Sequence, residues 1–272
     1  MNFGIIGGDN RQLFIKKFLE NKGYETRTFG CVGEEADNAA FDCDAVIFPM
    51  PLSRDGVTLN APSLEEKIPL LDIVSRLRPE QTVFGGFFPE CLRRELLNRK
   101  IRFFDYDESE YLTRLNAVLT AEGAVAVAVF STPRSIFESK SLVVGFGRIG
   151  RTLAKYLSVL GALVTVSARK ESDFADIRAC GFSSIKTADI ANFAEEFDLI
   201  FNTVPVEVFK DSALQKINPD CALIELASAP GGVDKKAAKK RNTKIINAPS
   251  LPGKYSPEKA AKIIFEFISD RI

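Results

Sequence analysis

Apolar runs of strand length alternate with helical patterns along this 272-residue chain, and this alternation restricts the folds open to it. Strands interleaved with helices form parallel sheets that are covered by helices on both faces. The first set of expected strands covers residues 3–6, 25–29, 45–48, 82–85 and 101–104, and the second covers 141–144, 163–167, 184–186, 199–202, 222–226 and 244–247. The two sets predict an α/β protein with two doubly wound, Rossmann-like domains and an interdomain cleft.

The domain boundaries follow from where these two sets end. Residues 1–107 are expected to form a Rossmann-like substrate domain, and residues 136–256 a dinucleotide-binding domain. Between them, residues 108–135 are expected to form a linking helix and a loop, with Gly123 interrupting the helix. Residues 257–272 carry apolar side chains at helical spacing and are expected to form a helix that packs back on the domains.

Composition excludes several classes of function. The 36 basic and 36 acidic residues cancel, which disfavours binding to nucleic acid or to an anionic membrane surface. Five cysteines that never form a CxxC pair, in a chain without histidine, leave no ligand set for zinc, and we interpret them as reduced core thiols. No charged and apolar leader and no apolar run of membrane-spanning length is evident, so a cytoplasmic protein is expected.

The stretch SLVVGFGRIG at residues 141–150 predicts a dinucleotide site. Gly145, Gly147 and Gly150 follow an apolar strand and open a helix, with Arg148 and Ile149 between the last two. In such a turn the first glycine allows the tight bend, the second lets a pyrophosphate approach the backbone, and the third lets helix and strand pack closely. The helix start then offers unpaired N–H groups to the phosphates.

The second strand of this domain indicates which dinucleotide is bound. An NAD enzyme carries Asp or Glu at its end, whereas this chain has Ser167 and Ala168, followed by Arg169 and Lys170. An arginine suits a 2′-phosphate because its guanidinium is a permanently charged fork of donors. The alternative is a solvated basic turn. NADP is therefore favoured over NAD.

Two later strand ends are expected at the same edge of the sheet. Each alone is more often an ordinary turn, but together they favour a rim around the cofactor. The residues concerned are Asn202, Thr203, Val204 and Pro205 in the first and Ala227 and Ser228 in the second.

The chain as a whole resembles the A subunit of dipicolinate synthase, a family of spore-forming bacteria. The resemblance is carried by GIIGGDNRQ, FPMPLSRDG, TAEGA, VVGFGRIG, NTVP, ASAPGG and APSLPGKYSPEKAA. It implies an NADP-linked dehydrogenase of sporulation that forms pyridine-2,6-dicarboxylate from a cyclic dihydro or hydroxytetrahydro precursor. It also implies a smaller, flavoprotein-like partner, the B subunit of the synthase, and it leaves assembly into a homo-oligomer open.

This chemistry suits a chain without histidine. Aromatisation of a dihydropyridine removes one hydride and one proton, so orientation supplies much of the acceleration and a carboxylate, a lysine or solvent accepts the proton. Two substrate carboxylates call for cations, hydroxyls or helix N-termini. We expect substrate contacts from Gly8, Asn10, Arg11, Ser53 and Thr120, and catalytic roles for Glu122 and Lys254.

Each of these substrate assignments has a plainer alternative. The GGDNRQ turn also fits an ordinary capped helix, residues 55 and 56 also fit a simple turn, and a lysine such as Lys254 is more often solvated. For the chain as a whole, two other functions stay open: an NADP-linked dehydrogenase of another keto or imino acid, and a non-catalytic NADP-binding protein within a larger complex.

Overall fold

The computed structural model describes all residues, 1–272, and they divide into two compact units. The first unit comprises Met1–Asn116 together with Gly253–Ile272, and the second comprises Ala117–Pro252. Each unit is built on one parallel sheet, which confirms the prediction of two doubly wound α/β domains. The division falls inside two helices, α4 (Glu110–Ser131) and α10 (Leu251–Tyr255).

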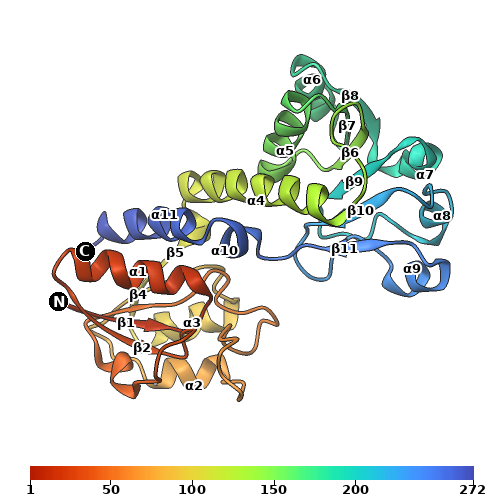
Figure 1. Cartoon of the computed structure of the whole chain (residues 1–272). Helices are drawn as coiled ribbons and strands as arrows, with labels where there is room; N and C mark the ends of the chain where they lie inside the picture. The colour runs from red at the N-terminus through yellow and green to blue at the C-terminus, as the bar shows by residue number, and fades with distance from the viewer. The chain divides into compact units, whose positions relative to one another are not determined.

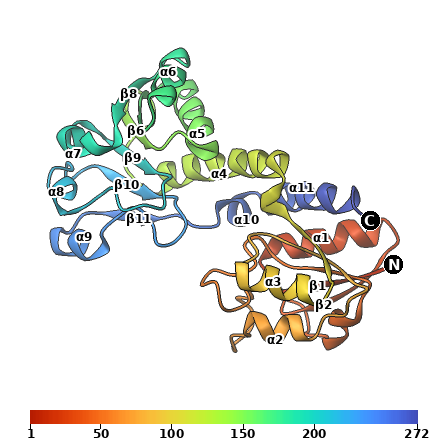
Figure 2. The same ribbon diagram turned by 180° about the vertical axis from the view of Figure 1, so that it is seen from behind.

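The first unit has a five-stranded sheet in the order β2-β1-β3-β4-β5 (Figure 1). Its strands are β1 (Asn2–Ile6), β2 (Glu25–Phe29), β3 (Ala45–Ile47), β4 (Thr82–Gly85) and β5 (Arg102–Asp105). On one face lie α1 (Asn10–Asn21) and α11 (Pro257–Ser269), and on the other lie α2 (Leu70–Ser75) and α3 (Glu90–Asn98), as Figure 2 shows from behind. The 3-10 helices η1 (Asn38–Asp42) and η2 (Tyr106–Glu108) complete the unit.

The C-terminal helix α11 belongs to the first unit because its apolar stripe packs on α1. The rings of Phe18 and Phe265 lie 5.6 Å apart, and Phe267 lies edge-on to the fully buried Tyr106 at 5.4 Å. Burial of one such aromatic side chain contributes roughly 1.5–3 kcal/mol. The expected stripe at positions 260, 263, 264, 267 and 268 is buried throughout.

The second unit has a six-stranded sheet in the order β11-β10-β9-β6-β7-β8. Its strands are β6 (Lys140–Val144), β7 (Leu163–Ala168), β8 (Ser183–Lys186), β9 (Leu199–Asn202), β10 (Ala222–Glu225) and β11 (Ile245–Asn247). One face is covered by α4, α5 (Arg148–Val159) and α6 (Glu171–Ala179). The other is covered by α7 (Ile190–Phe193), α8 (Asp211–Leu214) and α9 (Lys235–Arg241), with η3 (Thr187–Asp189) and η4 (Ala194–Glu196) nearby (Figure 1).

The strand order of the second unit reverses at β6. The chain first moves outward through β7 and β8 and then returns to the other side of β6 with β9, β10 and β11. In a parallel sheet of this order, the loops at the carboxyl ends of the strands part at the reversal and leave a crevice where dinucleotides bind. The fold therefore places the glycine-rich turn after β6 at the centre of the sheet.

Helix α4 is continuous from Glu110 to Ser131, so the interruption expected at Gly123 is absent. A Cβ atom at Gly123 would lie 2.7 Å from Cβ of Leu251, which shows that glycine here allows close packing rather than a break. By length and composition α4 is apolar enough to cross a membrane, but 56% of its apolar window is buried within the protein. Such burial is typical of a core helix.

All five cysteines are free thiols. Cys31, Cys43 and Cys221 are buried as expected, and burial raises the pKa of Cys31 and of Cys221 to about 12. Cys91 and Cys180 are exposed, so the prediction of core thiols is wrong for these two. Both lie at helix ends, Cys91 in the first turn of α3 and Cys180 at the end of α6, where the sequence pattern carries little information on burial.

Replacing Gly123 with Ala should destabilise the second unit. Alanine gains about 1 kcal/mol of helix propensity, but the contact with Leu251 imposes overpacking that costs about 1–3 kcal/mol. We expect a net fall in melting temperature of a few degrees, measured by circular dichroism. A rise in melting temperature for Gly123→Ala would contradict the packing argument.

Candidate functional site

The turn between β6 and α5 has a separate structural reason for each of its three glycines. Gly145 has φ +96°, and a Cβ atom there would lie 2.6 Å from Cγ1 of Val204. A Cβ atom at Gly150 would collide with the carbonyl oxygen of Gly145, so helix and strand pack at backbone distance. At Gly147 nothing lies within 4 Å of the Cβ position, so open space adjoins the backbone at the start of α5.

This turn fits a pyrophosphate. Gly147 is the N-cap of α5 and has no side-chain hydrogen bond to the helix, which leaves the first-turn N–H groups available to an anion. Arg148 is exposed and Ile149 half-buried at the same helix start. Thr203 donates from Oγ1 to the carbonyl oxygen of Val144 at 2.7 Å and so fixes the turn after β9 to the end of β6.

At the carboxyl end of β7 the side chains of Arg169 and Lys170 are exposed and form neither a hydrogen bond nor an ion pair. Ser167 lies differently: it is fully buried, and its hydroxyl accepts a hydrogen bond from Oγ1 of Thr187 at 3.4 Å. The sequence did not indicate Lys186, the last residue of β8. Its Cα is the register partner of Ala168, and its side chain is exposed, so it adds a third cation at this edge.

The turn after β9 is held by its own side chains. Asn202 is fully buried; its Nδ2 donates to the carbonyl oxygen of Val204 at 3.0 Å and to Oε1 of Glu225 at 2.7 Å. Val204 is half-buried and Pro205 exposed. Asn202 therefore fixes the turn from its buried side, and the surface of the turn is formed by Thr203, Val204 and Pro205.

The turn after β10 is organised by Glu225, which sequence reasoning missed. Its Oε1 accepts from the backbone N–H of Ala227 at 3.0 Å and its Oε2 from that of Gly232 at 3.0 Å. Ser228 is exposed at the tip of this turn, which also contains a cis peptide bond before Pro230. The available signal was an acidic residue closing an apolar strand, CALIE, where a buried charge is uncommon.

In the first unit the turn between β1 and α1 is built around Asp9 and Arg11. Asp9 caps α1, and Arg11 donates from Nε to Oδ1 of Asp9 at 2.8 Å and from Nη2 to the carbonyl oxygen of Met50 at 2.5 Å. Burial raises the pKa of Asp9, but the hydrogen bond and charge of Arg11 outweigh it and lower the pKa overall. Arg11 is buried, Gly8 is buried with φ +87°, and Asn10 is exposed.

The loop after β3 carries Ser53 beside the same strand edge. Asp55 orders this loop by accepting from the backbone N–H groups of Val57 and Thr58 and from the hydroxyl of Ser53, at 2.7–3.0 Å. These bonds lower the pKa of Asp55, with the bonds from Thr58 acting most strongly. Ser53 is thus half-buried within a formed turn.

The LPGK segment meets the β1–α1 turn inside the first unit. A Cβ atom at Gly253 would collide with the carboxylate of Asp9, so glycine is needed for this approach. Lys254, the next residue, is exposed and has no ion pair. The structure thus brings Lys254 to the turn that carries Gly8, Asn10 and Arg11, although these residues are more than 240 positions apart in the sequence.

The two residues expected on the linking helix differ in exposure. Thr120 is 7% exposed, whereas Glu122 is exposed, and both lie in the part of α4 that belongs to the second unit. No group of three or more Cys, Asp or Glu side chains lies in an arrangement that could hold a metal ion.

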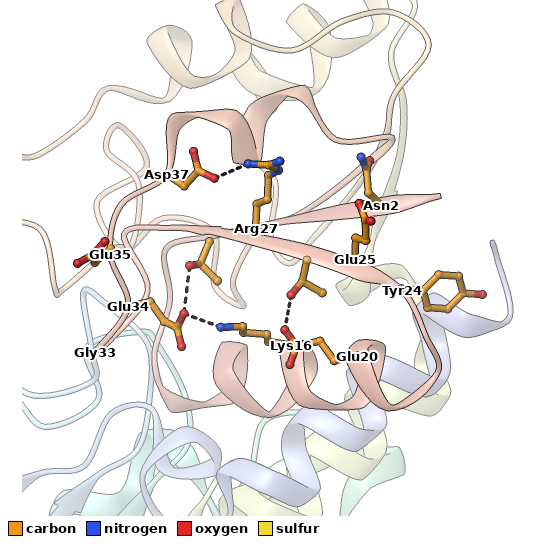
Figure 3. A pocket seen from close by; sticks show the side chains of 12 residues that line it. Asn2, Lys16, Glu20, Tyr24, Glu25, Arg27, Gly33, Glu34, Glu35 and Asp37 are labelled. Atoms are coloured by element: carbon orange, nitrogen blue, oxygen red, sulfur yellow. Dashed lines mark hydrogen bonds and ion pairs between the residues drawn. The ribbon is translucent and has the colours of Figure 1, made fainter.

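A pocket of about 750 Å³ lies elsewhere in the first unit, between α1 and the edge strand β2 (Figure 3). Its lining is strongly charged: Lys16 donates to Glu34 at 2.6 Å, which raises the pKa of Lys16, and Arg27 pairs with Asp37 at 2.9 Å. None of the residues expected from the sequence lines it. Both of its cations are thus paired with carboxylates of the same lining, so we regard it as a solvated surface rather than the reaction site.

Comparison with known proteins agrees with both halves of this description. Residues 2–106 match the model of the N-terminal domain of the dipicolinate synthase A subunit, and residues 118–243 match the NAD-binding domain of D-isomer specific 2-hydroxyacid dehydrogenases. The A subunit of dipicolinate synthase from Bacillus subtilis (strain 168) is 29% identical over 99% of this chain and 95% of its own length. The chain is thus similar to dipicolinate synthase A subunits along nearly its whole length.

Solved structures of dipicolinate synthase A subunits have the same fold. The A subunit of dipicolinate synthase from Bacillus halodurans superposes with a TM-score of 0.86 at 25% identity, covering 98% of both chains. The A chain from Bacillus subtilis gives a TM-score of 0.82 at 27% identity, covering 99% of this chain and 95% of that one. The second unit is thus a nicotinamide dinucleotide-binding domain of the dehydrogenase type, and the chain is an oxidoreductase.

Two variants of the glycine turn should separate binding from folding. Gly147→Val places a side chain in the open space at the start of α5, so we expect loss of dinucleotide binding with little change in the melting temperature of the free protein. Gly150→Ala forces a methyl group against the carbonyl oxygen of Gly145 and should lower the melting temperature markedly. Calorimetric titration and thermal melts measure the two effects, and normal dinucleotide binding by Gly147→Val would show that the cradle lies elsewhere.

Proposed function

We propose that this protein is an NADP-linked dehydrogenase that forms pyridine-2,6-dicarboxylate from a dihydro or hydroxytetrahydro precursor. The observation that carries the proposal is the open pyrophosphate cradle at Gly147, in a chain whose full length matches the A subunit of dipicolinate synthase. The reaction belongs to sporulation and takes place in the cytoplasm.

NADP is the proposed cofactor because the end of β7 lacks an acid and gathers cations. Arg169 and Lys170 follow the strand, Lys186 ends the neighbouring strand, and all three are exposed without ion pairs. A 2′-phosphate would provide these side chains with an anionic partner. Glu171 follows directly at the start of α6, where the helix dipole favours a carboxylate, and it leaves a net positive charge at this edge.

The chemistry requires a hydride acceptor and a proton acceptor. When bound, NADP supplies the hydride acceptor, and loss of one further proton completes the aromatic ring. We assign the proton to Glu122, an exposed carboxylate on α4, or to Lys254, an exposed amine beside the β1–α1 turn. Either group could accept the proton without help from a histidine. Because the aromatic product is stable, a weak general base is sufficient.

The substrate carboxylates are assigned to the carboxyl edge of the first sheet. Asn10, Ser53 and Lys254 offer an amide, a hydroxyl and a charge there, and Gly8 lets the ligand approach the backbone. Thr120 of α4 completes the proposed set. Arg11 already bonds Asp9 and Met50, so we assign it the role of holding the turns after β1 and β3 together, rather than a direct contact.

The relatives are named as one of the subunits of a synthase, and we propose that this chain likewise works with a flavoprotein-like partner, the B subunit. One alternative is a dehydrogenase of another keto or imino acid, since residues 118–243 match the NAD-binding domain of D-isomer specific 2-hydroxyacid dehydrogenases.

The proposed reaction can be followed directly. Purified protein should be incubated with NADP and the dihydro precursor, with and without the partner, while the absorbance of reduced nicotinamide and of the pyridine dicarboxylate is recorded. We expect both absorbances to rise together, because each hydride removed from the precursor reduces one NADP. Reduction of NADP without pyridine dicarboxylate formation would overturn the proposed substrate.

Cofactor preference should depend on Arg169. Loss of one charge-assisted hydrogen bond costs roughly 1.5–3 kcal/mol, so Arg169→Ala should weaken NADP binding about tenfold or more and leave NAD binding nearly unchanged. Dissociation constants for both cofactors measure this. Arg178→Ala, at the other end of α6, removes the same charge and is the control. An equal loss for NADP and NAD would contradict the assignment.

Substrate binding and turnover should respond to different residues. Lys254→Ala should raise KM for the dicarboxylate by about tenfold through loss of one charged contact, without changing NADP affinity. Glu122→Gln should lower kcat more than it raises KM if Glu122 accepts the proton. Lys259→Ala, an exposed lysine on α11, controls for net charge. Unchanged steady-state kinetics in both variants would remove these residues from the site.

A further inference from the structure

Glu225 is a buried carboxylate with only neutral partners. It is 6% exposed, and its three hydrogen-bond donors are the Asn202 amide at 2.7 Å and the backbone N–H groups of Ala227 and Gly232, each at 3.0 Å. No lysine or arginine forms an ion pair with it. Both oxygens act only as acceptors, which is the pattern of a carboxylate rather than of a carboxylic acid.

Glu225 lies on the side of the sheet that would hold the nicotinamide half of a bound dinucleotide. It is the last residue of β10, and its register partners are Asn202 on β9 and Asn247 on β11. These strands lie on the opposite side of β6 from β7, whose end carries Arg169. In a sheet of this order, each half of a dinucleotide lies over one side of the point where the strand order reverses. The cations proposed to bind the 2′-phosphate and Glu225 therefore lie at opposite ends of the dinucleotide.

Neutral hydrogen-bonding groups could hold the turns that form the rim, so these turns do not require a charged side chain at position 225. Asn202 already ties the turn after β9 to itself, since its Oδ1 accepts from the N–H of Val204 at 3.3 Å and its Nδ2 donates back to the carbonyl oxygen of the same residue. Burying a charge without a counter-ion is costly unless some other positive charge compensates for it. Oxidised nicotinamide carries such a charge, whereas the reduced ring is neutral.

We propose that Glu225 is a positioning residue that also biases the site electrostatically, favouring the oxidised cofactor over the reduced one. The inference rests on the proposed NADP-binding function. Its negative charge lies under the rim formed by the turns after β9 and β10, in a buried environment where salt screens it little. A site with this bias binds oxidised cofactor readily and releases reduced cofactor, as suits an enzyme that works in the direction of substrate oxidation.

The test compares dissociation constants of NADP⁺ and NADPH, measured by calorimetry without substrate. Glu225→Gln keeps the size of the side chain and removes the charge, so NADP⁺ should bind more weakly relative to NADPH by about fivefold or more, the size expected of one partly buried charge. Asn202→Ala is the matched control: it breaks the same network but leaves the charge, and should weaken both forms equally. Glu225→Asp should likewise keep the ratio.

A purely structural role for Glu225 would change both dissociation constants by the same factor in Glu225→Gln, and that result would overturn the inference while leaving NADP binding intact. Failure of the unmodified protein to bind either form would instead overturn the proposed function itself. Should Glu225→Gln not fold, the unmodified protein still provides a test. Binding of NADPH at least about tenfold more tightly than NADP⁺ would show that the buried charge exerts no such bias.

Discussion

The second unit depends on the close approach of α5 to the end of β6. Gly150 lies against the carbonyl oxygen of Gly145, and Gly145 lies against Val204 and Thr203, so the helix start, the central strand and the turn after β9 form one packed group. This contact directs the N-terminus of α5 into the crevice where the strand order reverses. The close contacts of this turn are made at Gly145 and Gly150, whereas the Cβ position of Gly147 faces open space.

Around this group, polar side chains rather than apolar packing shape the rim. Asn202, Glu225 and the N–H of Gly232 form one buried network, and a Cβ atom at Gly232 would collide with Asn202. Buried networks of this kind hold a structure well only when every member is satisfied. A change at Glu225 therefore acts on two turns at once, which is why its test needs a control that disturbs the same network without removing charge.

The first unit uses a comparable device. Asp9 caps α1, pairs with Arg11 and receives the backbone of Gly253, while Arg11 bonds the carbonyl oxygen of Met50. The turns after β1 and β3 and the start of the C-terminal segment thus share one partly buried ion pair. Exposed Asn10 and Lys254 gain defined positions from it, although neither contributes to the pair.

The sequence by itself determined the eleven strands to within a residue or two at their ends, the glycine turn and the cationic end of β7, because each depends on residues close together in the chain. Only the tertiary structure decided the rest. Lys186 lies opposite Ala168 because of strand register, Gly253 meets Asp9 across more than 240 residues, and Glu225 is buried because three donors converge on it. Gly123 was misread for the same reason: in sequence it resembles a helix breaker, and only the packing of Leu251 shows that it is a contact. Contacts between residues that are distant in sequence depend on how whole helices and strands pack, and the local periodicity of the sequence contains no information on this packing.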